Sequence, residues 1–137
     1  MSIEQNMIRA GIVSSANPSA GTVRVTFPDR DDLVSDDLPV LTPGGWGRGN
    51  SVPLPGESVL CAFLGNGLQV GICLGSYYTD DEKPPGTDEQ RGVWFEDGSQ
   101  VYYDRSIRKL VVKAAGGVKI DGDLEVTGSI KRAGEVL

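Results

Sequence analysis

A long alternation near the C-terminal end restricts the fold of this chain more than any other feature. From position 110 to position 130 every even residue is apolar or glycine, whereas the odd residues beyond Val111 are mostly polar. Such alternation is typical of a strand with one buried face, but single strands usually run for about 3–10 residues. The chain must therefore bend within this segment. Its apolar even positions are Leu110, Val112, Ala114, Val118, Ile120, Leu124, Val126 and Ile130.

Glycines indicate where the bends are expected. Gly116, Gly122 and Gly128 recur every six residues on the apolar phase, and glycine permits a positive φ or a close backbone approach. We predict that they are corners between short strands. A single ribbon of this kind buries nothing, so three copies around one axis are needed to enclose the apolar positions and remove exposed strand edges. The alternative is an antiparallel meander packed on the head, since Asp121-Gly122 and Thr127-Gly128 also suit hairpin turns.

Short strands and turns account for the rest of the chain, which we expect to be all-β. The 19 glycines and 8 prolines favour turns over helices. About five short strands in the N-terminal half match the size of a closed OB-type sheet. The expected organisation is an N-terminal arm over residues 1–7, an OB-fold-like head over 8–78, a linker loop over 79–92, and a hairpin with a trimeric triple-stranded β-helix or prism stem over 93–137.

Several local expectations concern turns and cysteines. Residues 59–64 are apolar at both parities, which predicts that one face fills a barrel interior and the other meets a neighbour. The Gly-Asn-Gly at 65–67 and the Asp-Gly at 97–98 predict hairpin turns, the latter of type I′. Cys61 and Cys73 lie in the two arms of one predicted hairpin. Free buried thiols are favoured there over a disulfide.

Composition excludes several classes of function. The chain of 137 residues has no histidine, which excludes Ser-His-Asp and Cys-His catalysis. Residues 1–91 hold 6 basic and 12 acidic side chains, whereas residues 92–137 hold 7 of each, so no specific nucleic-acid binding is expected. The acidic clusters lack the spacing of a calcium loop. We therefore predict no enzyme, no metal and no cofactor, and, since no apolar run could span a bilayer, folding in a soluble compartment.

Several stretches occur in an order that is itself informative. They are GTVRVTFP at 21–28, LPVL at 38–41, PGESVL at 55–60 and GICLGSY at 71–77, followed by the 97–99 turn, Tyr103-Asp104 and the glycine-spaced segment. Together they cover about residues 8 to 130. This order resembles the phage baseplate assembly protein V family, the central spike proteins of contractile tails, and more distantly the spike proteins of type VI secretion.

The resemblance implies a homotrimeric spike of the virion tail baseplate, assembled in the host cytoplasm. Its OB-fold head would bind the tail hub, and its β-helix stem would be driven through the host envelope when the sheath contracts. Without histidine, the chain cannot supply the His-x-His tip that binds iron in some relatives. One alternative is an OB-fold binding or adaptor module with no spike role, and a weaker one is a spike with hydrolase activity.

The end of the alternation suggests a binding site for a separate tip protein. Arg132 occupies a position that would otherwise point inward, and three arginines on one axis are strongly unfavourable without counter-charges. The regular stem is therefore expected to end near Ile130. We expect a separate tip protein to bind the open end through Ile130, Arg132, Val136 and Leu137.

Overall fold

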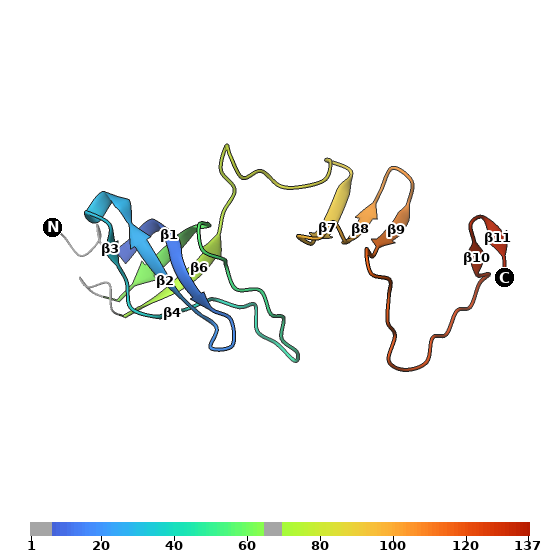
Figure 1. The fold of residues 1–137 in the computed structure, drawn as a ribbon, viewed down its shortest axis with the longest axis horizontal. Coiled ribbons are helices and arrows are strands. Elements are labelled where there is room, and N and C mark those ends of the chain that lie inside the picture. The colour runs from blue at the N-terminus through green and yellow to red at the C-terminus, as the bar shows by residue number, and fades with distance from the viewer. Residues whose placement is uncertain (1–6, 65–69) are drawn as a thin grey trace. The chain divides into compact units, whose positions relative to one another are not determined.

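The computed structural model describes residues 7–64 and 70–137 and contains two compact units, Met1–Pro84 and Pro85–Leu137 (Figure 1). We call them the head unit and the C-terminal unit. The described residues form antiparallel sheets and a short 3-10 helix, η1 (Pro28–Arg30), which confirms the prediction of a mostly β chain. Most of the expected N-terminal arm and the whole expected turn at 65–67 lie outside the described residues. Among the described residues, no helix is long and apolar enough to cross a membrane.

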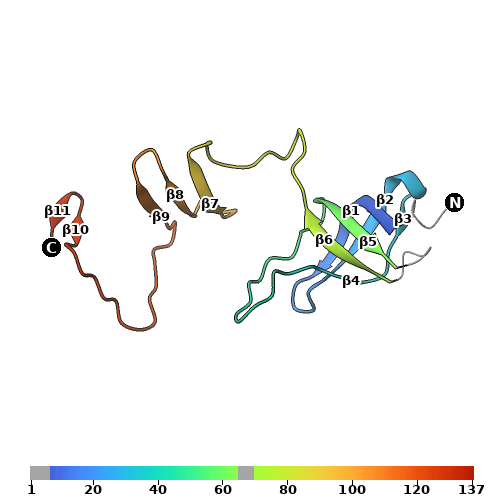
Figure 2. The same ribbon diagram turned by 180° about the vertical axis from the view of Figure 1, so that it is seen from behind.

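The head unit is built on an antiparallel sheet with the strand order β3-β2-β1-β5-β6, in which β4 also pairs with β2. Figure 2 shows β5 and β6 side by side. The central strand β1 is the longest, and its register with β2 shifts between Val13 and Ser15. The strands are β1 (Ile8–Asn17), β2 (Thr22–Phe27), β3 (Leu33–Val34), β4 (Leu38–Pro39), β5 (Ser58–Phe63) and β6 (Gly71–Ser76).

A further backbone contact links the two sides of this sheet. Val40, directly after β4, forms an isolated parallel bridge with Cys73 of β6. The amide of Leu41 donates to the carbonyl of Cys73 at 2.8 Å, and the amide of Val40 donates to the carbonyl of Gly21 at 2.9 Å. Backbone pairing therefore continues from β2, through the residues that follow β4, to β6.

The inward positions of these strands form one hydrophobic core. The rings of Phe27 and Phe63 meet edge to face, with centroids 5.7 Å apart. Arg9 lies over the Phe27 ring at 5.2 Å and donates to Asp29 at 2.8 Å, so its buried charge has both an aromatic and an ionic partner. The fully buried apolar residues are Val13, Val23, Val25, Phe27, Leu38, Val59, Cys61, Phe63 and Cys73.

The two cysteines are direct partners in the β5–β6 register. Both are buried, and they are free in this structure. The pKa of Cys61 is raised because its thiol forms a hydrogen bond with Cys73 and because the side chain is buried. Beside this pair the register shifts between Leu60 and Cys61, where Gly75 has a φ of 130°.

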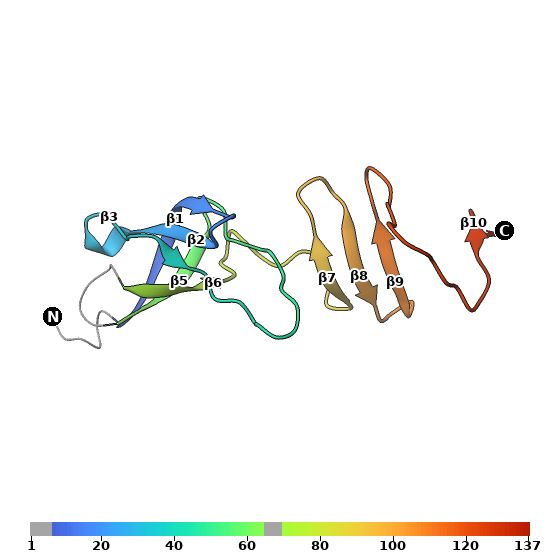
Figure 3. The ribbon, with the colours of Figure 1, turned by 90° about the horizontal axis from the view of Figure 1, so that it is seen from below.

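The C-terminal unit contains an antiparallel sheet of three neighbouring strands and a small hairpin near its end (Figure 3). Between them, residues 114–130 form turns or bends at 115–116, 121–122 and 127–128 and take part in no strand pairing. The first strand begins three residues before the hairpin that the sequence predicts. The strands are β7 (Gln90–Trp94), β8 (Gln100–Asp104), β9 (Lys109–Lys113), β10 (Lys131–Arg132) and β11 (Glu135–Val136).

The predicted type I′ turn between β7 and β8 is wrong. That turn requires a positive φ at both central residues, whereas here Gly98 has a φ of 88° and Asp97 is not among the residues with positive φ. The amide of Phe95 donates to the carbonyl of Ser99 at 2.8 Å across a three-residue loop. The Asp97 carboxylate accepts from the amide of Ser99 at 2.9 Å, which stabilises this longer turn with glycine in the left-handed position.

Candidate assembly interface

One face of the three-stranded sheet is exposed and mainly apolar, with Arg91 beside Tyr103 at its edge. The register places Val93, Val101 and Val112 in one row across the sheet and Tyr103 beside Leu110 in the next. All five are exposed, from 40% for Val101 to 68% for Leu110. We call these five residues the apolar sheet face. Contiguous exposed apolar surface of this kind is typical of interaction sites.

The opposite face of the same sheet is covered by its own aromatic residues. The rings of Trp94 and Tyr102 stack with centroids 5.3 Å apart and an interplanar angle of 11°. Gly92 lies opposite Tyr102, and a Cβ there would come within 2.1 Å of the Val101 carbonyl oxygen. A Cβ at Gly86 would come within 2.7 Å of the Trp94 ring. These glycines let the aromatic side chains lie against the backbone, where both rings are half-buried.

Polar contacts fasten one end of the sheet. Asp104 is buried and accepts hydrogen bonds from Ser106 and from Gln90, whose amide nitrogen lies 3.1 Å away. These bonds lower the pKa of Asp104. Arg105 donates to Glu89 at 2.6 Å and lowers the pKa of that carboxyl. Throughout residues 7–64 and 70–137, no three cysteine, aspartate or glutamate side chains gather in a way that could hold a metal ion.

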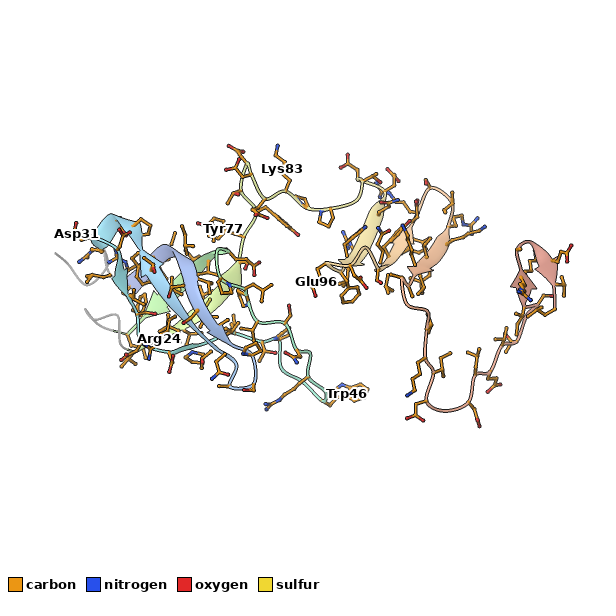
Figure 4. The ribbon with its side chains drawn as sticks, viewed as in Figure 1. Arg24, Asp31, Trp46, Tyr77, Lys83 and Glu96 are labelled. Carbon is orange, nitrogen blue, oxygen red and sulfur yellow. The ribbon has the colours of Figure 1, made fainter. Side chains whose placement is uncertain are left out.

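The apolar positions of the alternating segment are exposed on the single chain. Beyond β9 the exposed fraction runs from 45% for Val126 to 67% for Leu124, and Figure 4 shows the side chains projecting from this part of the chain. Leu110 and Val112 belong both to this row and to the apolar sheet face. The exposed members after β9 are Val118, Ile120, Leu124, Val126 and Ile130, while Ala114 is half-buried.

The predicted corners fall at or beside the turns and bends of this segment. Gly122 has a φ of 140°, which side chains rarely adopt. Gly116 lies in a turn and Gly128 in a bend, and neither has a positive φ. In the turn at Gly116 it is the next residue, Gly117, that has a positive φ, of 88°. The chain thus changes direction every six residues, at the same positions at which the glycines recur. Whether these glycines become corners of a stem stays a prediction.

The residues expected to bind a tip protein lie together in the last hairpin. Arg132 pairs with Glu135 across it, and the amide of Leu137 donates to the carbonyl of Ile130 at 2.7 Å. The turn has positive φ at Ala133 and Gly134. The chain therefore reverses just beyond Ile130, where the alternation ends. Val136 is also part of this hairpin and, like Ile130 and Leu137, it is exposed.

Sequence reasoning missed three members of the apolar sheet face. Val93, Val101 and Tyr103 precede the long alternation, and only their cross-strand register places them beside Leu110 and Val112. The Asp-Gly dipeptide alone would have given the wrong register, because a two-residue turn pairs Trp94 with Val101, whereas the three-residue loop pairs Val93 with Val101. A second sheet pairing, β8 with β9, was needed to extend the row.

No protein-family model matches the sequence. The chain is 27% identical over 128 residues to the spike protein of Escherichia phage P2, and this match covers 92% of the chain. The match includes both units and is a case of distant homology, which confirms the resemblance to a phage spike protein. The chain spans 59% of the length of that relative.

Proposed function

We propose that the protein is a structural component of a phage tail spike, which assembles as a homotrimer through its C-terminal unit and has no catalytic role. The observation that carries the proposal is the exposed apolar row that begins on the sheet face at Leu110 and Val112 and continues, with a change of direction every six residues, to Ile130. Homology to a phage spike protein supports a place in the virion tail.

The exposed apolar row from Leu110 to Ile130 is buried most simply against a partner surface with the same periodicity. Residues 114–130 make no strand pairs within their own chain. Apart from the few backbone groups bonded at the two ends of this segment, its backbone as well as its apolar side chains need partners for a rigid element. Copies of the same segment wound around one axis supply both and leave no strand edge. The resulting triple-stranded stem would transmit force when the sheath contracts and would pierce the host envelope without chemistry.

The head unit is proposed to be an OB-fold-like barrel that docks on the tail hub. The bridge between Val40 and Cys73 supports closure, because with it the pairings run in a ring through β1, β2, the residues after β4, β6 and β5. Trp46 supports docking, since it is fully exposed in the loop after β4 (Figure 4), and tryptophan is a frequent anchor of protein interfaces. Trp46→Ala should leave folding unchanged but reduce incorporation into particles. Normal incorporation would exclude this anchor.

The last hairpin is proposed to bind a separate tip protein, one copy for each trimer. The exposed side chains of Ile130, Val136 and Leu137 supply an apolar surface there. A chain truncated after Ile130 should still form trimers, while particles that carry it lose one small component. If such particles keep all their components and infect normally, the tip proposal is wrong.

The oligomeric state of the purified chain tests the main proposal. Light scattering should give a mass of three chains of 14.5 kDa each across micromolar concentrations. A stable monomer would refute the trimer and would favour the alternative of an OB-fold adaptor without a spike role. Removing the apolar side chains of the stem should convert the trimer to a monomer while the head unit stays folded.

A further inference from the structure

The outer face of the head unit carries a second unpartnered apolar surface. On β1, β5 and β6 the residues that alternate with the core positions point outward, and apart from Ser14, Ser58 and Ser76 they are apolar or glycine. The register aligns Ile8, Ala62 and Ile72 in one row across the three strands, and aligns Ala10 with Leu60 in the next. We call this surface the head apolar face. Its members are Ile8, Ala10, Ile12, Leu60, Ala62, Ile72 and Leu74, all exposed or half-buried.

A shallow groove continues this face at one end. It has a volume of about 400 Å³ and is lined by Leu60, Leu74, Gly75, Ser76 and Tyr77. The register shift beside Leu60 forms it, because Leu74 and Gly75 occupy the place of one residue there. A bulge of this kind re-aims side chains at a sheet surface. The head apolar face is thus apolar and also contains a groove into which a partner side chain can fit.

The charge of the head unit restricts what can approach it. Residues 1–84 hold 5 basic and 10 acidic side chains, and the acidic ones gather in loops such as 29–37 and 80–82. Two heads that approach each other through such loops repel. The outward positions over 8–14, 58–64 and 71–76 carry no charged residue. Through this surface, identical acidic heads can meet without placing like charges against each other.

We propose that the head apolar face is covered by the heads of the other copies, so that the three head units pack against one another around the trimer axis. This inference rests on the proposed trimer. Residues 77–89 join β6 to β7, and even a fully extended connection of this length spans no more than about 45 Å. Three heads tethered so closely experience an effective concentration in the millimolar range. Weak apolar contacts between them are therefore sufficient.

Photo-crosslinking of the full chain tests this contact. A benzophenone amino acid is placed at Ile72, on the face, and as a matched control at Val34 of β3, which is also apolar and exposed at 52%. Irradiation of the purified trimer should join chains from position 72 at least tenfold more efficiently than from position 34. The partner peptides should lie within residues 8–77 of another chain. Adding Ile72→Asp to a chain with the photo-reactive residue at Ile8 should abolish the links from Ile8.

The outcomes separate this inference from the proposed function. A trimer by light scattering that gives no links between chains from Ile72 or Ile8 overturns the packing of heads and leaves the trimer standing. Links from position 72 to a different protein in assembled particles, with none in the purified trimer, show that another tail component covers the face and also overturn it. A monomer refutes both proposals.

Discussion

Truncation of one stem side chain, Leu124→Ala, separates a trimeric stem from a loosely held segment of a single chain. Leu124 is 67% exposed on the single chain, so about one third of its surface is buried there. Full burial of a leucine side chain contributes roughly 1.5–3 kcal/mol. If the chain acts alone, the substitution should therefore change the free energy of unfolding by less than about 1 kcal/mol.

In the proposed trimer the same side chain would be buried three times around one axis. Leucine-to-alanine changes in protein cores cost about 2–5 kcal/mol each, which amounts to roughly 6–15 kcal/mol for the three chains. This loss is large relative to the stability of a typical domain, about 5–15 kcal/mol. We therefore expect Leu124→Ala to dissociate the trimer at micromolar concentration.

Urea unfolding at two protein concentrations, followed by circular dichroism and combined with light scattering, measures this effect. For a trimer the unfolding midpoint rises with protein concentration. The matched control is Asp123→Ala, because Asp123 is the chain neighbour of Leu124, lies on the opposite phase of the alternation and is exposed. It should change stability by no more than about 0.5 kcal/mol. If both variants unfold alike at midpoints that do not depend on concentration, the trimeric stem is refuted.

Three further predictions concern single positions. Gly117→Ala should destabilise the protein by roughly 1–2 kcal/mol, which is the cost of a left-handed conformation for a residue with a Cβ. Gly116→Ala should cost much less, because both sites have open space but only Gly117 has a positive φ. Thermal unfolding measures both costs, and equal values would contradict this. Cys61 and Cys73 should react with a thiol reagent only in denaturant, since both are buried, and rapid reaction in buffer would show that the head opens. The pKa of Asp104 is lowered because Ser106 and Gln90 donate hydrogen bonds to its carboxylate. Its contribution to stability should therefore be complete above the ordinary aspartate pKa of about 3.9 and should disappear as the pH falls through the lower pKa of the folded state. Acid unfolding of Asp104→Asn should lack this component, and an acid transition identical to that of the unsubstituted protein would argue against it.

Local patterns in the sequence determined the class of structure. Strict alternation, frequent glycine and proline, and the absence of long apolar runs sufficed to predict a mostly β chain and the apolar row from Leu110 to Ile130. These features depend on neighbours a few residues apart, because the period of a strand is two. The placement of Cys61 and Cys73 in the two arms of one hairpin also followed from the local pattern. The direct pairing of these two cysteines did not.

Tertiary structure decided everything that depends on register between distant strands. The bridge from Val40 to Cys73 joins residues 33 positions apart in the chain, and no local pattern specifies such a pairing. The same holds for the rows that make up the apolar sheet face and the head apolar face, since a shift of one residue would turn each row to the opposite side of its sheet. The turn at Asp97 was decided by a side-chain hydrogen bond to Ser99. The sequence alone thus determines which residues need a partner, whereas strand register determines which of them lie together, because pairing energies are summed over whole strands and not over neighbouring residues.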